Sequence, residues 1–84
     1  MAVQFGARGI RCNALAPGPI LTPHVEHFFA DPEARAARIA RIPLGRFGTP
    51  DDVAGLACFL ASDDALWFTG QVVTLDGGIS CHYL

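Results

Sequence analysis

The chain alternates short apolar runs with proline- and glycine-rich segments, and two of the runs have the pattern of β-strands. Residues 10–16 carry an apolar side chain at every second position, and Pro17-Gly18-Pro19 then prevents regular structure from continuing. A second short strand is predicted over residues 72–75, followed by a turn at residues 76–78. Because helical patterns separate the two strands, we expect them to pair in parallel through a crossover connection.

Three segments between these strands begin as helices do, with a capping side chain followed by proline. The first predicts a helix over residues 22–30 and the second a helix over residues 31–41. The third, Thr49-Pro50-Asp51-Asp52, also places two acids where the helix dipole favours them, and its helix ends at Ser62. This last helix carries an apolar face made by Val53, Leu56, Ala57 and Leu60.

Both the start of the chain and its composition predict that these residues are incomplete as a domain. Residues 1–5 resemble the last turn of a helix that stops at Gly6, and isolated helices shorter than ~12 residues are marginal in water. Of the 84 residues, 51% are hydrophobic and 17% are charged. A domain of this size buries only about 60% of its unfolded surface. We therefore expect a further part of the protein, or a partner subunit, to cover the remaining apolar surface.

Charge and cysteine content exclude several classes of function. The net charge is −2 with no basic cluster, so we expect no nucleic-acid partner. The longest uncharged stretch, residues 12–25, contains three prolines, and we expect no membrane span and no leader peptide. Three widely spaced cysteines do not form a disulfide framework, which favours a reducing cytoplasm.

A small metal-binding module is an alternative that the cysteines and histidines raise. His24 and His27 lie three residues apart on one predicted helix, but the sequence has no C-x-x-C or H-x-x-x-H pair. We therefore expect no metal site. The side chains considered for it are Cys12, Cys58, Cys81, His24, His27 and His82.

Three segments together resemble the C-terminal third of the classical short-chain dehydrogenase/reductase family. They are GIRCNALAPG, PLGRFGTPDDVA and TGQVVTLDGG, and the resemblance covers residues 5–78. It implies an α/β fold in which residues 1–84 form the C-terminal part of one Rossmann-like, doubly wound parallel sheet. That part would contain the last two strands and the helices between them.

The resemblance implies an enzyme that transfers a hydride between NAD or NADP and a small carbonyl or alcohol substrate. Pro17 and Gly18 would shape the loop under the nicotinamide, because glycine lets the main chain approach closely. The backbone around Ile20 and the hydroxyl of Thr22 would contact the carboxamide and the nearby phosphates. The alternative is that Pro17-Gly18-Pro19 only turns the chain and Thr22 only caps a helix.

Family position also implies a substrate lid at about residues 22–42 and a homo-oligomer surface at about residues 50–76. His24, His27 and Phe28 would line the lid, although packing or surface roles explain each of them as well. Three arginines in the lid, Arg35, Arg38 and Arg41, are expected on a solvated face, with contact to a phosphorylated cofactor or acyl carrier as the alternative. The oligomer surface would be made by apolar side chains.

The catalytic set of this family, a serine, a tyrosine and a lysine, is expected upstream of Met1. The chain contains no lysine, so nothing is placed to lower the pKa of its one tyrosine, Tyr83. We expect the 84 residues alone to be inactive and poorly folded. The alternative is a non-catalytic product, either truncated or serving only to associate with other subunits. The choice between NAD and NADP is expected to depend on a strand end upstream of this chain, and the substrate, the reaction direction and the oligomer size stay open.

Overall fold

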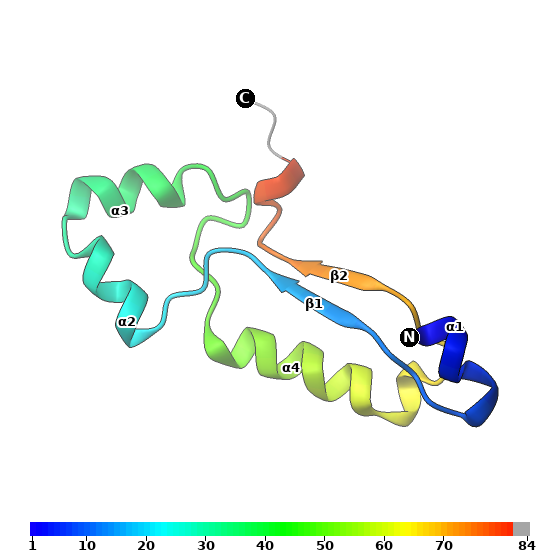
Figure 1. Ribbon diagram of the computed structural model, residues 1–84. Coiled ribbons are helices and arrows are strands. Elements are labelled where there is room, and N and C mark those ends of the chain that lie inside the picture. The colour runs from blue at the N-terminus through cyan, green and yellow to red at the C-terminus, as the bar shows by residue number, and fades with distance from the viewer. Residues whose placement is uncertain (82–84) are drawn as a thin grey trace.

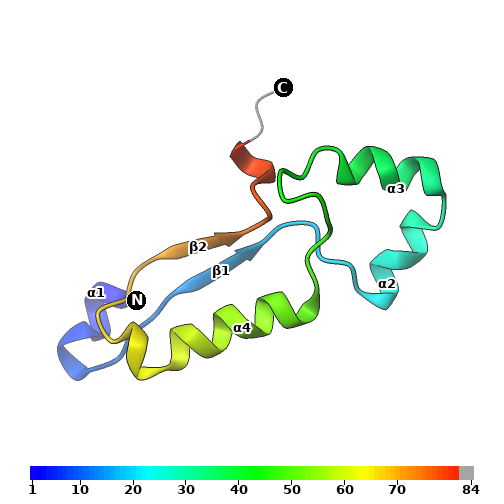
Figure 2. The same ribbon diagram turned by 180° about the vertical axis from the view of Figure 1, so that it is seen from behind.

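The computed structural model of the chain describes residues 1–81 as an elongated α/β unit measuring 51 × 29 × 20 Å. Two strands lie side by side with α4 running alongside them (Figures 1 and 2). Helices α2 and α3 lie beyond the carboxyl ends of the strands, and α1 lies beyond the amino ends. The elements are α1 (Ala2–Phe5), η1 (Gly6–Arg8), β1 (Ala14–Pro17), α2 (Pro23–Glu26), η2 (His27–Phe29), α3 (Pro32–Ile39), α4 (Pro50–Ala61), η3 (Asp63–Ala65), β2 (Val72–Leu75) and η4 (Ile79–Cys81).

The strands β1 and β2 pair in parallel, which confirms the predicted crossover. The register runs from Ala14 opposite Val72 to Pro17 opposite Leu75. The amide of Gly18 donates to the carbonyl of Leu75 at 2.9 Å and extends the pairing by one bond. Both strands therefore end at the same edge of the sheet, and the loops that follow them meet there.

The first strand begins four residues later than the sequence pattern predicts. Residues 11–13 lie outside the strand, and the polar side chains of Arg11 and Asn13 bond to distant backbone groups. Arg11 Nη1 donates to the carbonyl of Leu60 at 2.7 Å. Asn13 Nδ2 donates to the carbonyl of Phe68 at 2.9 Å, while its Oδ1 accepts from the amide of Gln71 at 3.1 Å. These side chains attach the approach to β1 onto the end of α4 and the start of β2.

The first α-helix ends at Phe5, as predicted, but Gly6 does not stop it by adopting a left-handed conformation. Gly6 keeps a helical conformation, with φ −58° and ψ −41°, and the chain continues into η1. The left-handed residue is Gly9, at φ 77°. The amide of Gly9 bonds to the carbonyl of Gly6, and the amide of Ile10 bonds to that of Phe5, which is a Schellman motif.

The three predicted helix starts are confirmed by their caps. Thr22 Oγ1 accepts from the amide of Val25 at 3.3 Å, and Asp31 Oδ1 accepts from the amide of Glu33 at 3.4 Å. Thr49 forms a capping box with Asp52 at the start of α4. The helix after Thr22 is shorter than predicted because its second half is the 3₁₀ turn η2, and α3 ends at Ile39.

The buried core is small for a chain of this length. Buried hydrophobic residues among those described are Ile42, Phe47, Leu60 and Ala65. The radius of gyration is 15.9 Å, against about 12 Å for a compact domain of 84 residues. Large apolar side chains are exposed at both ends of the molecule, and Trp67 is fully exposed. None of the helices in residues 1–81 has the length and apolar character needed to cross a bilayer.

We expect the isolated 84-residue chain to unfold without a sharp transition. Four buried apolar side chains remove too little surface from water to offset the conformational entropy of ordering the backbone. Thermal unfolding followed by circular dichroism at 222 nm should show a broad, sloping change. A steep, cooperative melt of the isolated chain would contradict this expectation.

A substitution at Gly18 tests how tightly the carboxyl ends of β1 and β2 pack. A Cβ placed on Gly18 would lie 2.5 Å from the Cβ of Asp76, so Gly18→Ala should lower the free energy of unfolding of the native protein by about 1–3 kcal/mol. Gly55→Ala is the matched control, because that position lies within α4 and has open space around it. It should raise stability by up to about 1 kcal/mol. Urea unfolding measures both, and equal shifts for the two variants would contradict the close contact.

Candidate functional site

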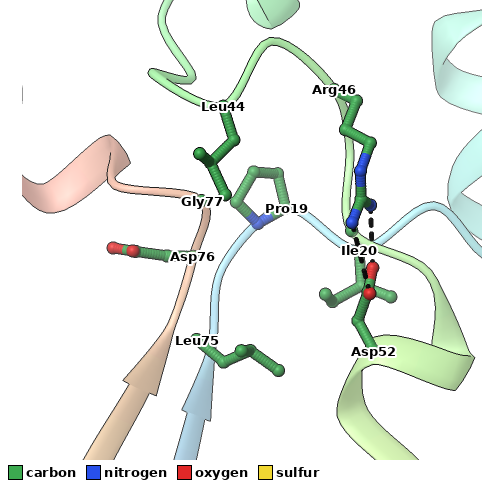
Figure 3. Close-up of a pocket in the computed structure, with 9 residues that line it drawn as sticks. Pro19, Ile20, Leu44, Arg46, Asp52, Leu75, Asp76 and Gly77 are labelled. Atoms are coloured by element: carbon green, nitrogen blue, oxygen red, sulfur yellow. Dashed lines mark hydrogen bonds and ion pairs between the residues drawn. The ribbon is translucent and has the colours of Figure 1, made fainter.

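A pocket of about 210 Å³ lies at the carboxyl ends of β1 and β2. Three segments meet around it, namely the loop after β1, the turn after β2 and the loop that leads into α4 (Figure 3). Its lining residues are Pro19, Ile20, Leu44, Arg46, Gly48, Asp52, Leu75, Asp76 and Gly77. Ligands of open α/β sheets bind beyond this edge, which makes the pocket and its surroundings the candidate site.

The loop after β1 is held against the loop before α4 by backbone contacts. The amide of Gly48 donates to the carbonyl of Pro19 at 3.0 Å, and the amide of Leu21 donates to the carbonyl of Gly48 at 2.9 Å. These two bonds form an isolated parallel bridge between Ile20 and Gly48. A Cβ on Gly48 would lie 2.5 Å from Ile20 Cδ1, so a larger residue at this position would require the Ile20 side chain to move.

The bridge leaves one edge of the Ile20 backbone open. In a parallel bridge, Gly48 bonds to the residues on either side of Ile20, so the N–H and C=O of Ile20 point the other way. Neither group has a hydrogen-bond partner within residues 1–81. A donor and an acceptor on one residue can pair with a primary carboxamide, which carries an NH₂ donor group and a carbonyl acceptor.

An ion pair lies at the rim of the pocket, between the loop before α4 and the helix itself. Arg46 Nη1 and Asp52 Oδ2 are 2.8 Å apart, and Arg46 Nη2 donates to Asp52 Oδ1 at 3.3 Å (Figure 3). Asp52 also accepts from the amide and the hydroxyl of Thr49, at 2.8 and 3.1 Å. The hydrogen bond from Arg46, followed by that from the Thr49 backbone, holds the pKa of the Asp52 carboxyl well below its usual range.

A second carboxylate, Asp76, orders the turn after β2. Its oxygens accept from the amides of Gly78 at 2.9 Å and Ser80 at 3.1 Å. Hydrogen bonds from the Ser80 side chain and the Gly78 backbone lower the pKa of Asp76. The turn needs φ 63° at Gly77 and 92° at Gly78, a region that favours glycine. The predicted turn after the second strand is thus confirmed, and it forms one wall of the pocket.

The four residues singled out for cofactor contact lie along one run that leaves the sheet edge. Pro17 ends β1, and Ile20 lines the pocket. The close approach at Gly18 is to Asp76 of the neighbouring turn. Thr22 lies farther along, outside the pocket lining, and its oxygen caps α2. The structure therefore gathers Ile20 and Gly18 at the sheet edge and leaves Thr22 at the start of the following helix.

The predicted lid residues cluster with one another instead of lining the pocket. The rings of His24 and His27 lie edge-on to Phe28, with centroids 5.6 and 6.0 Å away, and Phe28 is 67% exposed. The expectation of a solvated face is wrong for Arg35, which is half-buried with its guanidinium 5.7 Å from the centroid of the Phe47 ring.

The buried ring of Phe47 anchors the α2–α3 segment onto the loop before α4. The ring of Phe29 packs on that of Phe47 at 5.1 Å between centroids. Phe47 follows Arg46 and precedes Gly48, so one short loop carries the ion pair, this anchor and the bridge to Ile20. The sequence did not predict Arg46, Phe47 or Asp76 as residues of the site. The sequence signal that could have indicated the ion pair is an arginine shortly before a capping box.

The metal alternative gains no support from the described part of the chain. Within residues 1–81, no three side chains of the His, Cys, Asp or Glu type converge to hold an ion. Cys58 and Cys81 are exposed and Cys12 is half-buried, all as free thiols. Two residues weighed above, His82 and Tyr83, lie outside the described residues.

The family model described as enoyl-(acyl carrier protein) reductase matches residues 1–80. The chain is 49% identical over 82 residues to 3β-hydroxysteroid dehydrogenase 1 of Eggerthella lenta, covering 98% of this chain and 31% of that protein. It is 51% identical over 79 residues to a 3-oxoacyl-(acyl carrier protein) reductase of Thermotoga maritima, covering 93% and 31%. It is 42% identical over 84 residues to an inactive 2-(S)-hydroxypropyl-CoM dehydrogenase of Xanthobacter autotrophicus, covering 95% and 36%. The chain thus spans about a third of the length of these relatives.

Solved structures agree in fold, and they include proteins that bind or depend on nicotinamide cofactors. A 4-hydroxyisoleucine dehydrogenase complexed with NADH superposes with a TM-score of 0.90 at 32% identity, covering 96% of this chain and 33% of that one. The NADPH-dependent reductase YwfH, involved in bacilysin biosynthesis, superposes with a TM-score of 0.83 at 34% identity, covering 93% and 33%. The expectation that the family uses NAD or NADP is confirmed. The extent of the family match, the relatives and the shared fold together establish that this chain belongs to the short-chain dehydrogenase/reductase family.

Proposed function

We propose that these residues form the C-terminal third of an NAD(P)-dependent oxidoreductase. The enzyme would transfer a hydride between the nicotinamide and a small carbonyl or alcohol substrate. The observation that carries the proposal is the open backbone edge of Ile20 beside the pocket at the carboxyl ends of the strands. In this proposal the chain supplies the loop beside the nicotinamide, a lid at about residues 22–42 and an oligomer surface.

The residues present fit the nicotinamide end of the cofactor. The N–H of Ile20 would donate to the carboxamide oxygen, and its C=O would accept from the carboxamide NH₂. Thr22 uses its oxygen to cap α2 and keeps its O–H available to donate toward a phosphate. Pro17 and Gly18 act indirectly, because the packing of Gly18 on Asp76 fixes where the loop leaves the sheet. When bound, the cofactor supplies or accepts the hydride.

The chemistry of proton transfer must come from outside these residues. The chain has no lysine, and the family's catalytic serine, tyrosine and lysine are proposed to lie in the remaining two thirds that its relatives possess. The exposed apolar residues at both ends of the strands are the surfaces that such a remainder would cover.

A non-catalytic role is the second candidate, and one comparison favours it. A relative 42% identical to the chain is itself described as inactive, so membership of this family does not require catalysis. In that case the chain would serve as a truncated or association module. Its exposed Phe59, Leu66, Trp67 and Val72, within residues 50–76, would then be its contact surface. The same side chains are the proposed homo-oligomer surface of the enzyme.

The substrate stays open within the carbonyl and alcohol class. A steroid dehydrogenase and an acyl-carrier reductase match the chain at 49% and 51% identity, so this region does not separate their substrates. The exposed lid side chains of His24, His27 and Phe28 are the proposed contacts to whichever substrate is used. Free thiols fit the proposed cytoplasmic location.

The intact mass and cofactor binding of the native protein test the proposal together. We expect a species much heavier than 8.9 kDa that contains these residues, enhances NADH or NADPH fluorescence on binding and oxidises or reduces a carbonyl/alcohol pair. A native species of 8.9 kDa that binds neither cofactor would instead support the non-catalytic candidate.

Thr22→Ala should weaken nicotinamide cofactor binding by the native protein about tenfold, the cost of one hydrogen bond to a charged group. Thr22→Ser is the matched control, because it keeps both the hydroxyl and the cap on α2, and it should bind as the wild type does. Isothermal titration with NADH and NADPH gives the affinities. Unchanged affinity in Thr22→Ala would remove this residue from the site.

A further inference from the structure

The Asp52 carboxylate joins two residues of the loop before α4, Arg46 and Thr49. It accepts two hydrogen bonds from the Arg46 guanidinium and two from Thr49, one from its amide and one from its hydroxyl. Arg46 Nη1 also donates to the carbonyl of Phe47 at 2.9 Å. The backbone between Arg46 and Thr49 is therefore fixed at both of its ends by one side-chain network.

Gly48 lies inside this fixed segment and carries the bridge to Ile20. Its amide and carbonyl form the two bonds that flank Ile20, and its missing side chain leaves room for Ile20 Cδ1. A change in the Arg46–Thr49 backbone is therefore transmitted to Ile20 through two hydrogen bonds and one van der Waals contact. No longer path of side-chain contacts is required.

The ion pair contributes more to local geometry than to the stability of the whole fold. The side chains of Arg46 and Asp52 are 59% and 33% exposed, and exposed pairs contribute little to the free energy of unfolding. The bidentate contact nevertheless restricts the loop, because a planar guanidinium meets a carboxylate in a narrow range of orientations. Such a pair suits the positioning of a neighbouring group.

We propose that Arg46 and Asp52 are positioning residues which, through Gly48, aim the open backbone edge of Ile20 and so set the affinity for the nicotinamide cofactor. This inference rests on the proposed function, since Ile20 meets the carboxamide only if the protein binds NAD or NADP. Neither side chain is required to touch the cofactor. The pair acts by holding the loop that does.

Arg46→Met removes the ion pair and leaves the capping box between Thr49 and Asp52 in place. In the native protein we expect it to weaken NADH or NADPH binding about fivefold to tenfold. Amide hydrogen exchange at Leu21, which bonds to Gly48, should accelerate, and the melting temperature should change by less than about 3 °C.

Two further variants serve as controls. Arg46→Lys keeps the charge without the planar guanidinium and should recover part of the cofactor affinity. Arg8→Met is the control, since it removes an exposed arginine from η1 at the other end of the strands.

The outcomes separate this inference from the function on which it rests. If the wild type and Arg8→Met bind cofactor and Arg46→Met binds equally well, the positioning role is overturned and the proposed function stands. The positioning role is also overturned, and the proposed function stands, if exchange at Leu21 accelerates with no loss of cofactor affinity. A loss of protection from amide exchange throughout the fold in Arg46→Met would have the same meaning. If the wild type binds neither NADH nor NADPH, the proposed function fails, and the positioning role fails with it.

Discussion

The parallel pairing of β1 with β2 determines where every other element can lie. Two short strands that run in the same direction need a long crossover, and α2, α3 and α4 provide it. Since both strands end at one edge, Ile20 from one loop and Asp76 from the other lie around the same pocket. Antiparallel pairing would have placed these residues at opposite ends of the sheet. The site thus follows from strand direction before any side chain is considered.

Local signals predicted the elements well, and contacts between distant residues explain the misses. The caps at Thr22, Asp31 and Thr49 can each be recognised from four consecutive residues of the sequence. Each of them begins a helix in the structure. Just before β1, Arg11 bonds to the carbonyl of Leu60, which is 49 residues away. No sequence pattern shows that contact. Likewise, the Arg35 guanidinium meets the Phe47 ring only because the crossover folds back on itself between α3 and the loop before α4.

The site was predictable in outline, because a run that leaves a parallel strand must pass the edge where ligands bind. The roles of individual residues within the site were less predictable from the sequence. Gly18 was expected to make room for a cofactor, and the structure shows that it makes room for Asp76. Arg46 and Asp52 meet across the capping box that begins α4, a contact between side chains six residues apart.

The contacts at Gly18 and Gly48 have a consequence for how proteins of this kind diversify. Both are contacts of main chain with its neighbours, and neither uses a side chain from α2 or α3. The position of Ile20 is therefore insulated from the sequence of those helices, provided that a ring such as Phe29 still packs on Phe47. We therefore expect that α2 and α3 can be replaced in the laboratory without altering the contacts that hold this loop.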